Sequence, residues 1–139
     1  MRTNSSIIKR VALGGYIGIV AYATLFSRTP DHDPLSVVFS GWLISCGADG
    51  WDFRPLYNAL MLTPLIFLLL LNFPQIGGKS TAQLLKRAAW IGFLTSLFIE
   101  CSQLIFCVGT FQISDLVYNT VSSVIGGYLY EMYKRHLNK

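Results

Sequence analysis

The chain has 139 residues, enough for a single domain, and 53% of them are hydrophobic while only 13% are charged. This charged fraction is well below that of soluble proteins and argues against a water-soluble globular fold. The net charge is +4. Because the cations are divided among three short segments, they favour anchoring to anionic lipid headgroups over nucleic-acid binding.

Four apolar segments approach the length of about 20 residues that a helix needs to cross a bilayer. They predict transmembrane helices over residues 9–27, 55–73, 87–108 and 113–133. The first segment also has the basic start and short apolar run of a signal peptide. No convincing cleavage site follows it, which favours a retained anchor. We therefore predict an all-α membrane protein whose residues 1–139 form one transmembrane domain.

The positions of the cations predict the orientation of these helices. All Lys and Arg residues except Arg28 and Arg54 lie before or at the start of the first predicted helix, between the second and third or at the start of the third, or after the fourth. Short cytoplasmic loops carry the excess of Lys and Arg in membrane proteins. The pattern thus predicts a multi-pass membrane protein with both termini in the cytoplasm.

The first outer loop, Ser27–Pro55, contains an apolar stretch of its own. Leu35–Cys46 is too short to span a bilayer and predicts an interfacial or re-entrant helix, with Trp42 at the headgroup level. This segment either anchors the loop to the outer surface or covers a site. Cys46 and Cys107 both fall on the outer side, and whether they form a disulfide is left open, because their separation cannot be read from sequence.

Small residues four positions apart predict close helix packing in the first and fourth helices. The pairs are Gly14 with Gly18 and Ser122 with Gly126. No cofactor or metal is predicted, because Gly77–Ser80 lacks the earlier glycine of a phosphate-binding loop and His and Cys residues form no metal-spaced cluster.

Polar residues inside the predicted helices are the main functional signal. A carboxylate in a transmembrane segment costs at least ~2.5 kcal/mol, so Glu100 needs a partner or a role. Gln103 lies on the same helical face, and Asp115 and Asn119 share one face of the fourth helix. With the two outer cations available for charge-assisted pairing, we predict a polar pocket that opens outward. Its ligand-binding residues are Arg28, Arg54, Asn58, Glu100, Gln103, Asp115 and Asn119.

Two interpretations of this cluster stay open. The side chains either join three helices through polar contacts or bind an external ligand, with Glu100 and Asp115 as candidate acid–base residues. An intramembrane enzyme acting on a lipid-linked substrate is the less favoured version, because no nucleophile lies beside a base in the sequence. A third hypothesis is a small subunit that docks its Gly- and Ser-rich faces onto a larger membrane protein.

The segment from Glu100 to Gly127, ECSQLIFCVGTFQISDLVYNTVSSVIGG, resembles the signature of the VanZ-like family. The family pattern has E-x-x-Q, a G-T-F turn and D-x-x-x-N-T-x-G-x-x-x-G. The matching residues are Glu100, Gln103, Gly109, Thr110, Phe111, Asp115, Asn119, Thr120 and Gly126. Ser122 replaces the first glycine of the last motif. In the upstream stretch Asn58–Pro64, which is similar to the family's N-x-x-x-F-x-P-x-G, Leu62 and Ile66 depart from the pattern.

The resemblance implies a protein of the bacterial inner membrane with no established chemistry, whose name-giving relative is linked to teicoplanin resistance. It implies a role in the cell envelope, in which the polar pocket meets a cell-wall precursor, a lipid headgroup or a glycopeptide. Membrane lipids are the expected partners, an oligomer or partner subunit is left open, and a non-enzymatic role is favoured over an enzymatic one.

Overall fold

The computed structural model describes residues 2–28, 35, 38–42, 45–47 and 50–137. Within these, the side chains of residues 2–5, 45–47, 50–52, 54–55 and 58–59 lie outside the described part. The elements in chain order are α1 (Arg2–Ala21), a π-helical turn η1 (Tyr22–Phe26), β1 (Ser45–Gly47), β2 (Gly50–Asp52), α2 (Arg54–Asn72), a 3₁₀ turn η2 (Pro74–Gly77), α3 (Thr81–Phe106) and α4 (Ile113–Leu137).

The predicted helical fold class is confirmed, and the structure corrects the helix bounds. α1 begins at Arg2 rather than residue 9, and α4 continues to Leu137 rather than 133. α3 begins at Thr81 rather than 87, because the Ser80 hydroxyl caps it by accepting from the Gln83 N–H at 3.2 Å. The hydrophobic pattern marks only the apolar part of a helix, so it misses polar turns at the ends.

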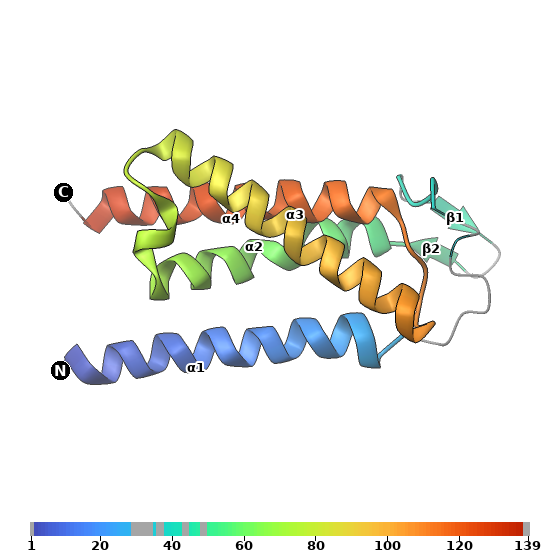
Figure 1. Ribbon diagram of the computed structural model, residues 1–139, viewed down its shortest axis with the longest axis horizontal. Helices are drawn as coiled ribbons and strands as arrows, with labels where there is room; N and C mark the ends of the chain where they lie inside the picture. The colour runs from blue at the N-terminus through green and yellow to red at the C-terminus, as the bar shows by residue number, and fades with distance from the viewer. Residues whose placement is uncertain (1, 29–34, 36–37, 43–44, 48–49, 138–139) are drawn as a thin grey trace.

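Within the described residues, two helical stretches are long and apolar enough to cross a membrane. They are Ser6–Phe26, which includes η1, and Thr81–Phe106. The apolar part of α2 is the shorter stretch Leu60–Asn72. The first and last described residues lie at one end of the bundle, and the β1–β2 hairpin lies at the other end, near the α3–α4 connection (Figure 1).

The helix predicted over Leu35–Cys46 is not formed in the residues that are described there. Leu35, Val38 and Phe39 lie in turns, and the antiparallel strand β1 begins at Ser45. Gly41 has a φ of +80°, a left-handed conformation that a continuous α-helix cannot contain. The described residues of this segment therefore form turns and irregular structure, and they are followed by a short β-hairpin.

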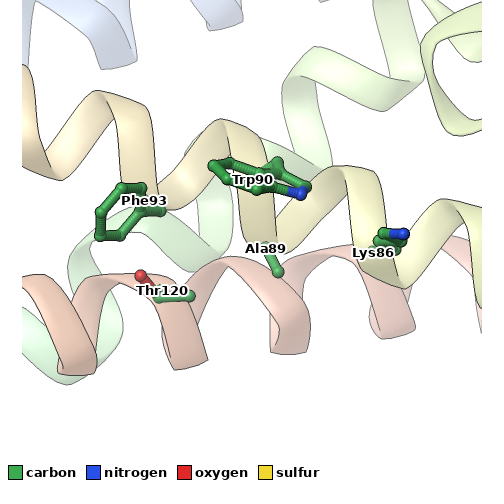
Figure 2. Close-up of a pocket in the computed structure, with 5 residues that line it drawn as sticks. All are labelled: Lys86, Ala89, Trp90, Phe93 and Thr120. Atoms are coloured by element: carbon green, nitrogen blue, oxygen red, sulfur yellow. The ribbon is translucent and has the colours of Figure 1, made fainter.

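α4 forms the two most extensive helix interfaces, one with α2 and one with α3 (Figure 1). On one side of the α3–α4 crossing, a groove of about 290 Å³ is lined by Trp90 and Phe93 of α3 and by Thr120 of α4 (Figure 2). The two aromatic rings meet edge to face at 6.0 Å between centroids. The groove is shallow and apolar, and the polar residues of interest lie elsewhere.

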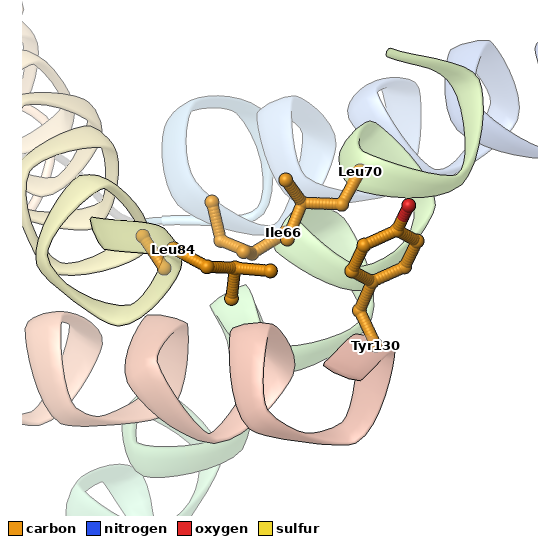
Figure 3. Close-up of a cluster of buried hydrophobic side chains, with 5 residues drawn as sticks. Ile66, Leu70, Leu84 and Tyr130 are labelled. Atoms are coloured by element: carbon orange, nitrogen blue, oxygen red, sulfur yellow. The ribbon is translucent and has the colours of Figure 1, made fainter. Parts of the chain in front are cut away.

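The hydrophobic core lies where α2, α3 and α4 meet, toward the end that carries both termini. Ile66 and Leu70 of α2 pack with Leu84 of α3 and Tyr130 of α4 (Figure 3). Each of these side chains is at most 6% exposed. This cluster packs the three helices against one another, and the polar residues described next lie farther from that end of the bundle.

Glycines divide the bundle into a tight part and an open part. A Cβ on Gly126 would overlap the Thr63 carbonyl oxygen of α2, and a Cβ on Gly92 of α3 would overlap the Ser123 side chain of α4. By contrast, a Cβ on Gly14 or Gly18 would meet nothing within 4 Å. The close packing expected at Gly14 and Gly18 therefore does not occur, because α1 does not turn this face toward a neighbouring helix.

Candidate functional site

Four polar side chains from α3 and α4 form a buried cluster, which we call the polar cluster. Glu100 and Gln103 come from α3, and Asp115 and Asn119 come from α4. Asp115 is 6% exposed and the other three are at most 2% exposed. Spacings of three and four residues put the two side chains of each pair on one face of their helix. These two faces meet at the α3–α4 crossing.

Glu100 is held by the connection between α3 and α4. Its Oε2 accepts a hydrogen bond from the Gln112 backbone N–H at 2.9 Å. The chain can turn back here because Cys107 and Gly109 adopt left-handed conformations, with φ of 52° and 85°. Cys107 ends α3 as a free, exposed thiol.

Among the described residues, one further carboxylate and one cation contribute to the electrostatic surroundings of Glu100. Asp115 interacts with it unfavourably and Arg28 favourably. The aliphatic part of the Arg28 side chain lies along Gly109, where a Cβ would be 3.6 Å from Arg28 Cδ. The structure thus brings one of the two predicted outer cations to the polar cluster. The side chains of Arg54 and Asn58 lie outside the described residues.

The side-chain amides of Gln103 and Asn119 each donate one hydrogen bond, and among the described residues the carbonyl oxygen of each amide accepts none. Gln103 Nε2 donates to the Thr24 carbonyl of η1 at 2.8 Å, and Asn119 Nδ2 donates to Ser96 Oγ at 2.9 Å. Within the described part of the protein, Gln103 Oε1 and Asn119 Oδ1 are buried without a hydrogen-bond partner. A buried acceptor without a donor costs about 1–3 kcal/mol. Two such oxygens in one cluster call for an explanation beyond helix packing.

Residues 38–42 of the outer loop cover the end of α4 beside the polar cluster. The Ile113 N–H donates to the Val38 carbonyl at 3.0 Å, and the Ser114 hydroxyl donates to the Ser40 carbonyl at 2.8 Å. The Tyr118 hydroxyl donates to the carbonyl of Trp42, whose ring lies against the Tyr118 ring. These three hydrogen bonds hold residues 38–42 against the first turns of α4, and we call this segment the cover.

Comparison with known proteins places this region in a known family. The family model described as VanZ/LLP1 matches residues 14–134, which include the whole polar cluster. The chain belongs to the VanZ-like family. Proteins of this family are membrane-associated, in agreement with the two helices that are long and apolar enough to cross a bilayer.

One relative of this VanZ-like protein is Protein VanZ of Enterococcus faecium, which is 33% identical over 82 residues. The match covers 59% of this chain and 47% of that protein. The chain therefore spans about half the length of the curated relative it matches. No solved structure gives a significant match.

The VanZ-like fold closes the cluster more completely than the sequence predicts. A pocket opening outward is expected from sequence, yet the four cluster residues are almost fully buried and the loop lies beside them. Gly41 favours this close approach of the loop, because its φ of +80° is a conformation that other residues rarely adopt and its lack of a Cβ leaves room for the Gln112 side chain. The four cluster side chains are thus closed off in this structure.

Three contributors to the site are missed by sequence reasoning. Ser96 lies one helical turn before Glu100, and this spacing would have revealed it. Thr24 contributes a backbone carbonyl from a π-helical turn, and Gln112 contributes a backbone N–H. Backbone groups carry no residue-type signal, so the last two could not have been found. Among the described residues, no group of three His, Cys, Asp or Glu side chains could hold a metal ion.

Proposed function

We propose that this VanZ-like protein crosses the bacterial inner membrane four times, with both termini in the cytoplasm. The distribution of Lys and Arg supports this orientation, as does the position of the first and last described residues at one end of the bundle (Figure 1). In a variant with Cys46 and Cys101 changed to Ser, a membrane-impermeant maleimide should label Cys107 from outside intact cells. Labelling only after the cells are opened would contradict the orientation.

We further propose that the polar cluster binds a ligand at the outer face and thereby contributes to glycopeptide resistance of the teicoplanin type. The observation that carries the proposal is the pair of buried, unpartnered amide oxygens on Gln103 and Asn119. They lie beside two carboxyl groups, so the cluster is rich in acceptors. Its complement is a group with N–H or O–H donors, as found on a cell-wall precursor, a lipid headgroup or a glycopeptide.

Binding requires the cover formed by residues 38–42 to move. Three hydrogen bonds hold this cover to Ile113, Ser114 and Tyr118, and each is worth about 0.5–1.5 kcal/mol. This is small enough for a ligand to replace them with its own contacts to the cluster. Arg28, next to Gly109, lies at the side of the cluster and supplies a cation for an anionic part of the same ligand.

Binding is better supported than catalysis. The hydroxyl groups of Ser114 and Ser123 donate to backbone carbonyls, at 2.8 Å in both cases, so neither is paired with a base. Glu100 is fixed by the backbone N–H of Gln112. An enzyme using Glu100 as acid or base would have to use its other oxygen or break this hydrogen bond first.

The test is Glu100→Gln in a strain whose teicoplanin resistance depends on this protein. We expect a normal yield of folded protein and increased susceptibility, because the amide keeps the shape and removes the charge. Glu131→Gln is the matched control, since Glu131 lies at the other end of α4 in an ion pair with Arg135. A loss of folded protein would assign Glu100 to packing, and unchanged susceptibility with normal yield would overturn its role as a ligand-binding residue.

A further inference from the structure

A second cavity lies between α1, α2 and α3 and reaches the polar cluster at its narrow end, where Thr24 belongs to both. It is an apolar crevice of about 310 Å³, within the size range of ligand sites. Side chains from all three helices line it, among them Leu13 and Ile17 of α1, Leu65 and Leu69 of α2, and Ile91 and Thr95 of α3. The two helices on its sides, α1 and α3, are those long and apolar enough to cross a membrane.

The crevice is a wedge whose shape is fixed by hydrogen bonds. α1 and α3 meet where Gln103 donates to Thr24, and they diverge toward the end that carries the N-terminus (Figure 1). α1 is also tied to α2, since Tyr16 Oη donates to the Met61 carbonyl at 2.9 Å and Asn72 Nδ2 donates to the Lys9 carbonyl at 3.0 Å. With α1 held at these points, it does not close onto α3.

Hydrocarbon is the occupant that suits this wedge. The lining of the wedge has two hydroxyl groups: that of buried Thr24, which donates to the Val20 carbonyl of α1 at 2.8 Å, and that of half-buried Thr95; the other lining side chains are apolar. A cavity with such a lining does not hold water, because a water molecule needs two to four polar partners. Between two membrane-crossing helices, the available apolar material is the acyl chain of a lipid.

Two basic residues, Lys9 and Arg87, lie toward the wide end of the crevice. Lys9 is four residues before Leu13 on α1, and Arg87 is four residues before Ile91 on α3, so each continues the face that lines the cavity. In the described part of the chain, neither side chain forms an ion pair. The Arg87 guanidinium donates to the Ile76 carbonyl at 3.0 Å and has further N–H donors available.

We propose that this crevice is a binding site for one anionic phospholipid. An acyl chain fills the wedge between α1 and α3, and the lipid phosphate is held by Lys9 and Arg87. The site contains none of the four side chains of the polar cluster and does not depend on the function proposed for them. The bound lipid completes the packing of α1, because α3 is contacted mainly by the η1 turn that follows α1.

The first test fills the crevice. Wild-type protein in mild detergent is mixed with phosphatidylglycerol and phosphatidylcholine, and retained lipid is measured by native mass spectrometry. We expect wild type to keep phosphatidylglycerol and Thr95→Phe to lose it, because the ring occupies the acyl-chain space. Leu94→Phe is the control, since Leu94 is 56% exposed and does not line the crevice. Ile17→Phe fills the same space from α1 if Thr95→Phe does not fold.

The second test removes the charges. The double variant Lys9→Gln/Arg87→Gln should lose on the order of tenfold or more of its preference for phosphatidylglycerol over phosphatidylcholine. Lys79→Gln/Lys134→Gln, with the same change in net charge, should keep the preference. The proposal is overturned if wild type retains no lipid, if the filled variants retain as much as wild type, or if both double variants behave alike. Dissociation of a dimer by Thr95→Phe would also overturn it, because the crevice would then hold a second copy.

Discussion

α4 and α1 both contain small residues four positions apart, yet the two helices pack in different ways. On α4, Ser122 and Gly126 face α2, where the Thr63 hydroxyl donates to the Ser122 carbonyl at 2.8 Å. On α1, Gly14 and Gly18 face away from every helix in the described part of the chain. A spacing of small residues permits close approach, and the rest of each surface decides whether a partner uses it.

The largest effect is expected from Gly126→Ala. Its Cβ would overlap the Thr63 backbone carbonyl, which cannot move without shifting α2. Overpacking of this kind costs about 1–3 kcal/mol. The measurement is the free energy of unfolding, or the thermal midpoint, in detergent. If stability stays at the wild-type value, the tight α2–α4 interface described here is wrong.

A smaller effect is expected where α1 is tied to α2. Tyr16→Phe removes the hydrogen bond to the Met61 carbonyl and should destabilise the protein by about 0.6 kcal/mol, the average for such contacts between membrane helices. Tyr22→Phe on the same helix is the control, because Tyr22 is 65% exposed. Equal effects of the two substitutions would show that the Tyr16 contact does not hold α1.

The smallest effect is expected from Gly18→Ala. Nothing lies within 4 Å of the added Cβ, and alanine favours a helix over glycine by up to about 1 kcal/mol, so stability should be unchanged or slightly increased. Thermal unfolding next to Gly126→Ala makes the comparison direct. A clear loss of stability would mean that this face of α1 has a partner, such as a second subunit.

The polar cluster is the part of the site that could be predicted from sequence. Spacings of three and four residues put Glu100 with Gln103 and Asp115 with Asn119 on single faces. Since charged and amide groups avoid lipid, each face has to turn toward another helix. The sequence therefore predicts which side chains come together, but not which atoms form hydrogen bonds.

The cover and the helix pairing could not be predicted in the same way. Gly41 is in a left-handed conformation because the loop packs against Gln112, a contact between residues far apart in sequence. The apolar pattern of Leu35–Cys46 favours a membrane-surface helix and contains no signal for this contact. Likewise, the Gly14–Gly18 spacing is the same as Ser122–Gly126, so spacing alone cannot tell an open face from a packed one.

The central claim is that the polar cluster is a binding site, and Gln103→Met tests it most directly. The substitution removes the buried, unpartnered Oε1, which costs about 1–3 kcal/mol in the wild type. It also removes the hydrogen bond to the Thr24 carbonyl, worth about 1 kcal/mol, and leaves that carbonyl without this donor. Stability and teicoplanin resistance are measured on the same variant. We predict that stability stays within about 1 kcal/mol of wild type, or rises, while resistance is lost. Full resistance at unchanged stability would contradict the claim, as would a loss of several kcal/mol, which would make Gln103 a packing residue.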